Sequence, residues 1–340
     1  MDDDRQRRDG LVKAEDLLPE LARKIRDSGP TPIQQRLMNA AEATASAEQR
    51  ELLYQHTVFC QTSLPYRDPG DLRTWERENG AVRLEVNAGK AMHPVEGRFV
   101  ELGLPFGPKA RMILMHINQQ ALRSQSPEID IQDTLSKFVR RTLNLDPHGR
   151  NMRIVKDQLG RLSASSIRLG VVRNGHALTV NSQIITAFDV WFPKDDRQRI
   201  LWPSTVKLSL DYWESLKIHA VPLDEVAIAG LSHSSMGLDI YAWLAQRLHR
   251  IDPNKPQHIT WESLHRQFGQ GYDPEWIENF RRTFRVALKQ VKQVYREARV
   301  AEGRQPAPQR VILAGKLAWR EPPAKGLVLR HSPPPVAGRR

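Results

Sequence analysis

The sequence predicts an α+β protein in which two similar helix-rich units follow one another. One observation is a repeat of helix starts at a nearly constant offset: Pro108, Asp133 and Gly149, then Ser235, Thr260 and Pro274. A second is the chemistry of these starts. Asp133 and Thr260 are good N-cap residues, and Pro274 stands at a first helical position, where proline is favoured. The third is that runs of β-type residues follow each set of helices.

The order of elements within each unit predicts a winged helix. A short β segment separates the first two expected helices, at 129–131 in one unit and 258–259 in the other. In the first unit, β-type runs at 166–172 and 178–185 flank Asn174 and Gly175, a strong hairpin signal that predicts the wing. In the second unit, residues 309–314 are the expected wing strand. We therefore expect two tandem winged-helix domains.

Composition sets the expected boundaries. Residues 1–57 are charged and alanine-rich, which predicts an N-terminal extension that is partly helical and partly disordered. The first winged-helix domain is expected over 58–215 and the second over 216–315. Residues 316–340 are rich in proline, so we expect a disordered C-terminal tail that could be removed with little effect on the two domains.

The expected helix at 273–299 carries an apolar stripe and a basic stripe on different sides. Residues of the apolar stripe recur every three or four positions: Ile277, Phe280, Phe284, Ala287, Leu288, Val291 and Tyr295. The basic stripe covers an arc of roughly 100°. Its members are Arg281, Arg282, Arg285, Lys289, Lys292, Arg296 and Arg299.

Two interpretations of this basic stripe compete. A charged helix face is usually a solvated face, but such faces normally mix acids with bases. Here no acidic residue lies between Arg281 and Arg296, and Glu275, Glu278 and Glu297 stand near the helix ends. Cations without counter-charges repel one another, and a polyanion would remove that cost. The stripe therefore favours a nucleic-acid interface.

The helix expected from Gly149 repeats this design. Its apolar stripe is formed by Met152, Val155, Leu159 and Leu162. The cations Arg150, Arg153 and Arg161 lie opposite it, with Lys156 at the flank. Two further cations, Arg168 and Arg173, fall on the predicted wing. Most of the formal net charge of +12 is concentrated in these two segments.

Composition also bears on the membrane and on the compartment. No run of 18 apolar residues occurs, and the first ten residues are too polar for a signal peptide, so no membrane partner is expected. The single cysteine, Cys60, excludes an internal disulfide and fits a reducing cytoplasm.

Motifs of common enzyme classes are missing from the sequence. Neither Gly89-Lys90 nor Gly315-Lys316 completes a phosphate-binding loop, and the histidines form no His-x-His pair. A rolling-circle nickase needs such a pair, and a tyrosine recombinase needs His-x-x-Arg. We therefore expect no enzymatic activity, no cofactor and no metal.

Several segments resemble bacterial plasmid-encoded RepA replication initiators, over about residues 58–300. They include FVELGLPFGPKARMIL, DTLSKFVRRTLNL, GRNMRIVKDQLGRLSASSIRL, LDIYAWLAQRL, ITWESLHRQFGQGY and FRRTFRVALKQVKQVY. The resemblance implies binding to iterons in double-stranded plasmid origin DNA and opening of an adjacent AT-rich region. It further implies recruitment of the host initiator and replicative helicase, and a balance of monomers and homodimers.

The resemblance also implies roles for the cations. Base readers in the major groove would be Glu278, Arg281, Arg282 and Arg285, because they lie in the first turns of the long helix. Lys289, Lys292 and Arg296 would hold phosphates. The first domain's cations would contact the DNA backbone or a neighbouring groove. One alternative is a transcriptional repressor of the same fold. Iterated repeats and an AT-rich tract beside the gene would favour the initiator over this repressor. Another is a nickase or recombinase, which a nicking assay would reveal.

Overall fold

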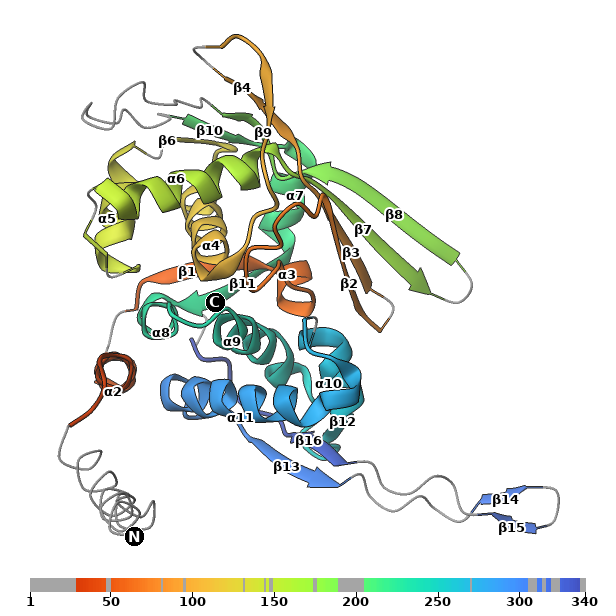
Figure 1. Ribbon diagram of the computed structural model, residues 1–340. Helices are drawn as coiled ribbons and strands as arrows, with labels where there is room; N and C mark the ends of the chain where they lie inside the picture. The colour runs from red at the N-terminus through yellow and green to blue at the C-terminus, as the bar shows by residue number, and fades with distance from the viewer. Residues whose placement is uncertain are drawn as a thin grey trace, which may run out of the picture.

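The computed structural model shows a mixed α/β protein in which two units of similar element order pack against each other, one in the upper and one in the lower half of Figure 1. The structure describes residues 29–46, 50–80, 82–93, 96–130, 132–143, 145–146, 149–173, 176–188, 205–269, 271–304, 311–313, 316–318 and 325–336. Within these ranges, side chains are left undescribed at 132–135, 169, 171–173, 176–182, 187–188, 304, 311–313 and 316–318.

The first unit contains three helices and a small antiparallel sheet. The helices are α4 (Gly107–Ser124), α5 (Gln132–Arg141) and α6 (Gly149–Ala164). The sheet has the order β6-β10-β9, from β6 (Glu128–Asp130), β10 (Thr205–Leu208) and β9 (Ile185–Phe188). The expected start of α6 at Gly149 is confirmed, whereas α5 begins at Gln132 and places Asp133 inside its first turn.

The hairpin predicted after α6 exists, but it is not part of this small sheet. Strands β7 (Ser166–Arg173) and β8 (His176–Gln183) extend a four-stranded sheet of order β2-β3-β7-β8, with β2 (Thr74–Asn79) and β3 (Val82–Asn87). Leu84 and Val86 of β3 and Ile167 of β7 are buried on this sheet. The hairpin signal is local, whereas the choice of sheet depends on which distant strand offers an apolar partner face.

The second unit repeats the order of the first. Helices α9 (Ser235–Arg247), α10 (Trp261–Phe268) and α11 (Ile277–Val294) follow the predicted starts, with a 3-10 turn at Pro274–Trp276 before α11. Thr260 caps α10, since its hydroxyl accepts from the Ser263 N–H at 3.2 Å. Strands β12 (Gln257–Thr260), β16 (Lys325–Leu329) and β13 (Val300–Arg304) form a sheet in the order β12-β16-β13.

The prediction of a disordered tail over 316–340 is wrong for residues 325–336. Strand β16 is the central strand of its sheet, where Leu329 pairs with Gln257 on one side and Val300 on the other. Leu327 and Leu329 are fully buried. The prediction rested on the high proline content of the whole segment, which outweighed this short apolar run. The expected wing strand at 309–314 instead contributes β14 (Val311–Leu313), which pairs with β15 (Lys316–Ala318) as a separate hairpin.

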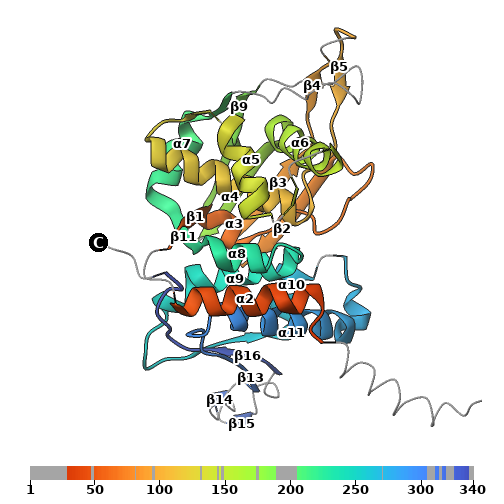
Figure 2. The same cartoon turned by 90° about the vertical axis from the view of Figure 1, so that its left-hand side faces the viewer.

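The remaining elements tie the two units together. Strand β1 (Leu52–His56) pairs antiparallel with β11 (Ala220–Asp224), which follows α7 (Leu210–His219) and precedes α8 (Glu225–Gly230). Helix α3 (Thr57–Gln61) packs on α9, and the short β4 (Lys90–Met92) pairs with β5 (Phe99–Glu101). Helix α2 (Pro32–Ser46) packs against α8 and α11, and Figure 2 shows it lying across the second unit.

A buried ion pair joins the first helices of the two units. Arg111 on α4 donates to both carboxylate oxygens of Asp239 on α9, at 2.7 Å and 2.9 Å. The same guanidinium donates to the carbonyls of Leu64, Pro65 and Gly107. Arg111 is 2% exposed and Asp239 is 6% exposed. Burial raises the pKa of Asp239, and the positive charge of Arg111 opposes that rise.

Substituting Asp239 by alanine is expected to lower the free energy of unfolding by about 3–5 kcal/mol, because the Arg111 charge would stay buried without its partner. Chemical denaturation measures this loss. The control Glu42→Ala removes an exposed carboxylate from α2 and should change stability by less than about 0.5 kcal/mol. Equal losses in the two variants would contradict the role assigned to the pair.

Substituting Leu327 by alanine is expected to cost about 2–5 kcal/mol, because it leaves a cavity under the central strand of the second sheet. The exposed Arg330→Ala in the same segment is the control. Removing 316–340 should destabilise the second unit as well, contrary to what the proline content predicts, and a thermal melt of the truncated chain would show it. An unchanged melting temperature would mean that β16 is dispensable.

Candidate nucleic-acid interface

Helix α11 is fixed by an aromatic cluster on its apolar face. Phe280 and Phe284 are fully buried and meet Trp261 of α10 edge-on, with ring centroids 6.3 Å and 5.7 Å away. Phe268 packs against Phe284 at 5.5 Å. Because α10, α9 and α11 share this core, α11 has one determined rotation about its axis, and its other faces are determined too.

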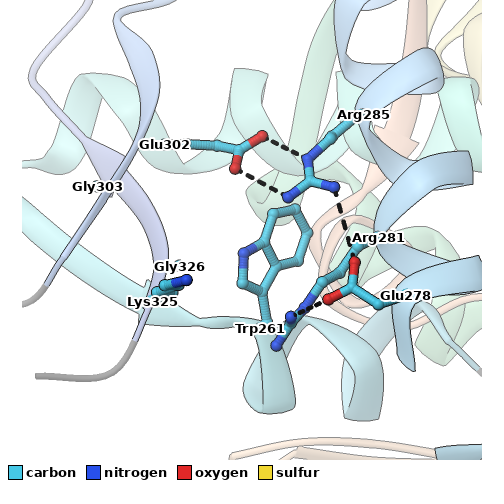
Figure 3. Close-up of a pocket in the computed structure, with 8 residues that line it drawn as sticks. All are labelled: Trp261, Glu278, Arg281, Arg285, Glu302, Gly303, Lys325 and Gly326. Atoms are coloured by element: carbon cyan, nitrogen blue, oxygen red, sulfur yellow. Dashed lines mark hydrogen bonds and ion pairs between the residues drawn. The ribbon is translucent and has the colours of Figure 1, made fainter. Parts of the chain in front are cut away.

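Two cations of the basic stripe are paired with acids, and Figure 3 shows their pairs with Glu302 and Glu278. Arg285 holds Glu302 of β13 with two hydrogen bonds, Nε to Oε1 at 2.6 Å and Nη2 to Oε2 at 3.1 Å. Arg281 pairs with Glu278 at 2.5 Å and with Glu262 of α10 at 3.6 Å. The expectation that the stripe lacks counter-charges is therefore wrong at these two positions. Glu278 on the same helix supplies one counter-charge, and folding brings Glu262 and Glu302 from other elements.

Both guanidiniums also lie against Trp261. Their carbon centres are 5.1 Å from the ring centroid for Arg285 and 5.7 Å for Arg281, within the range of cation–π attraction. Hydrogen bonding to Glu302 raises the pKa of Arg285 further above its ordinary value. The two side chains are thus anchored to the protein by charge and by stacking.

These residues line an open pocket of about 300 Å³ between α11, α10 and the β13–β16 edge (Figure 3). Lys325 at the start of β16 adds a third cation, and Glu278 and Glu302 supply two carboxylates. The buried Nε of Arg281 has no hydrogen-bond partner. The pocket therefore has a small excess of positive charge and is open to an anionic group.

The other cations of the basic stripe form no ion pair with Glu278 or Glu302 among the described residues. Lys292 donates to the Val300 carbonyl at 3.1 Å, and Arg296 donates to the Ala41 carbonyl of α2 at 3.2 Å. Carbonyl contacts orient these cations without neutralising them. Arg282 and Lys289 are exposed, with Arg282 at 3.5 Å from the amide oxygen of Asn279.

A stripe that sequence reasoning missed faces solvent along α11. Its members are spaced alternately three and four residues apart and are all exposed: Asn279, Arg282, Val286, Lys289 and Gln293. Val286 is 55% exposed, so the stripe includes an apolar side chain that faces solvent. Helical spacing could have revealed the stripe, but a search for cations passed over the amides and the valine.

The cations of α6 differ in how exposed they are. Arg150 and Arg153 are exposed. Arg161 is held by Asp157 at 2.9 Å, approaches Asp68 at 3.8 Å and lies 5.1 Å from the Phe106 ring centroid. Desolvation lowers the pKa of Lys156 to about 8. Among these four cations, Arg150 and Arg153 are therefore the exposed ones.

The cations predicted on the hairpin after α6 lie on its first strand, β7. Arg168 is on β7 in the four-stranded sheet and forms an ion pair with Glu85 of β3. The side chain of Arg173 lies outside the described residues. The structure therefore separates both from the small sheet β6-β10-β9 that follows α6.

Within the residues that the structure describes, no group of three or more His, Cys, Asp or Glu is arranged to hold a metal ion. Cys60 is buried and reduced, and burial raises the pKa of its thiol. Over the same described residues, no helix is both long and apolar enough to cross a membrane.

Comparison with known proteins confirms the resemblance inferred from the sequence. The family described as plasmid encoded RepA protein matches residues 104–263, from the start of the first unit into α10 of the second. No curated protein sequence matches the chain.

Solved structures of domains 2 and 3 of RctB are similar to this chain at low identity. A selenomethionine derivative has 9% identity and a TM-score of 0.47, covering 78% of this chain and 94% of the other. A second structure of these domains has 10% identity and a TM-score of 0.45, covering 81% of this chain and 96% of the other.

Proposed function

We propose that the protein is a plasmid replication initiator that binds repeated sites in duplex origin DNA, without enzymatic activity. The match of residues 104–263 to plasmid-encoded RepA proteins carries this proposal. The exposed cations of α11 and α6 and the net charge of +12 support DNA as the partner.

The element order supports two winged helices. Each unit runs helix, strand, helix, helix and then two strands, and in each small sheet the last strand lies between the other two. In this arrangement the third helix, α6 or α11, enters the major groove, and the last two strands of each unit, β9 and β10 or β13 and β16, belong to the wing. The β7–β8 hairpin is then an insertion between α6 and the wing of the first unit.

Both third helices would act on one DNA segment, because α4 and α9 are held together by Arg111 and Asp239. A rigid pair of reading units suits a binding site that spans successive turns of the duplex. Origin opening, recruitment of the host initiator and replicative helicase, and homodimerisation complete the proposal by resemblance. A transcriptional repressor of the same fold is the second candidate, supported by the same basic helices.

Binding is tested with duplex DNA that flanks the gene, against a scrambled duplex. We expect log affinity to fall with log salt concentration with a slope on the order of −5 or steeper, because several phosphates are neutralised at once. Gel-shift titrations at several salt concentrations give the slope. A flat response would contradict binding through both basic helices.

Substituting Lys289 by alanine is expected to lower the affinity for the specific and the scrambled duplex by similar factors. It should also flatten the salt slope by about one unit, because one phosphate contact is lost. The control Lys217→Ala removes a cation of α7 that is paired with Glu214. Equal losses of affinity in the two variants would mean that the DNA does not bind along α11.

Replication itself separates the two candidates. A plasmid that carries the flanking DNA should be maintained in a host only when the protein is supplied. Binding to the DNA without maintenance would favour the repressor. Nicking of supercoiled DNA by the purified protein would overturn the proposal that it is not an enzyme.

A further inference from the structure

Arg285 is not free to read a base in the usual way. A guanine is read by two parallel N–H groups of one arginine. In this protein the Nε and Nη2 groups of Arg285 are bound by Glu302, and Nη1 lies 4.0 Å from Glu278. The geometry that would grip a guanine is already used within the protein.

Arg281 is restrained in a similar way. Its side chain is 17% exposed, it pairs with Glu278 and Glu262, and it lies against the same indole ring as Arg285. Trp261 is only 1% exposed, so this ring is a rigid support. Both arginines thus behave as parts of the scaffold that connects α11 with α10 and β13.

We propose that Glu302 determines DNA specificity by withholding Arg285 from phosphates, and that the exposed stripe of α11 reads the bases in its place. Asn279, Arg282 and Val286 are the readers. Their chemistry fits base edges in the major groove, since asparagine pairs with adenine, arginine with guanine, and an apolar group with the thymine methyl. This inference rests on the proposed binding of duplex DNA.

The charge of Glu302 has a second consequence. Non-specific affinity depends on the number of phosphates neutralised. A released Arg285 would add one phosphate contact to any duplex, specific or scrambled, which at 0.15 M salt corresponds to about fivefold in affinity. Keeping the arginine paired lowers binding to the many wrong sites, whereas the specific site retains its base contacts.

The test compares Glu302→Gln with Glu297→Gln, which removes the same charge from an exposed position beyond the end of α11. We expect Glu302→Gln to bind the scrambled duplex about fivefold more tightly than the control does, with a salt slope steeper by about one unit. Adding Arg285→Ala to Glu302→Gln should abolish this gain, because the gain requires the released guanidinium.

A second pair of variants tests the readers. Arg282→Ala should weaken the specific duplex by about tenfold or more and spare the scrambled duplex. Arg285→Ala should lower the affinity for the specific duplex much less than Arg282→Ala does. Thermal melts establish that each variant is folded.

The inference is overturned if Glu302→Gln behaves like Glu297→Gln, or if its gain persists without Arg285. It is also overturned if Arg285→Ala, rather than Arg282→Ala, selectively weakens the specific duplex. Failure of the wild-type protein to bind either duplex is a different result, which would refute the proposed DNA binding itself.

Discussion

The ion pair of Arg111 and Asp239 is the contact on which the arrangement of the two units depends. It connects α4 with α9, the first helices of the two repeats, and anchors the preceding loop through the carbonyls of Leu64 and Pro65. A buried pair of this kind contributes little net stability but is costly to break, because either charge alone would be unsolvated. It therefore restricts the two units to one relative orientation, and so places α6 relative to α11.

The second constraint is that α11 serves the core and the candidate interface at once. Phe280 and Phe284 fix its rotation against α10, so the positions of its polar side chains follow from apolar packing. The same packing brings Glu302 of β13 next to Arg285. Charge on this helix is therefore divided between scaffold and surface. Arg281 and Arg285 connect α11 with α10 and β13, whereas Arg282 and Lys289 are exposed and available to a polyanion.

Much of the local structure could be predicted from the residues. Caps and periodicity located α6, α10 and α11, and the repeat of helix starts was visible without any structure. Which strands pair with one another could not be predicted in the same way. Strands β7 and β8 formed the predicted hairpin but joined β3, and β16 was hidden among prolines although its leucines complete the second sheet. Such pairings depend on surfaces brought together by chain segments far apart in sequence.

The sequence by itself determined the helices, their apolar stripes and the excess of positive charge, because each follows from the type and spacing of neighbouring residues. Only the tertiary structure decided which of those charges are paired with acids. Arg281 and Arg285 belong to the same helical arc as Arg282 and Lys289, yet among the described residues Glu262 and Glu302 form ion pairs with the first two and not with the others. The physical reason is that a helical wheel fixes directions within one helix, whereas electrostatic pairing depends on distances to other elements.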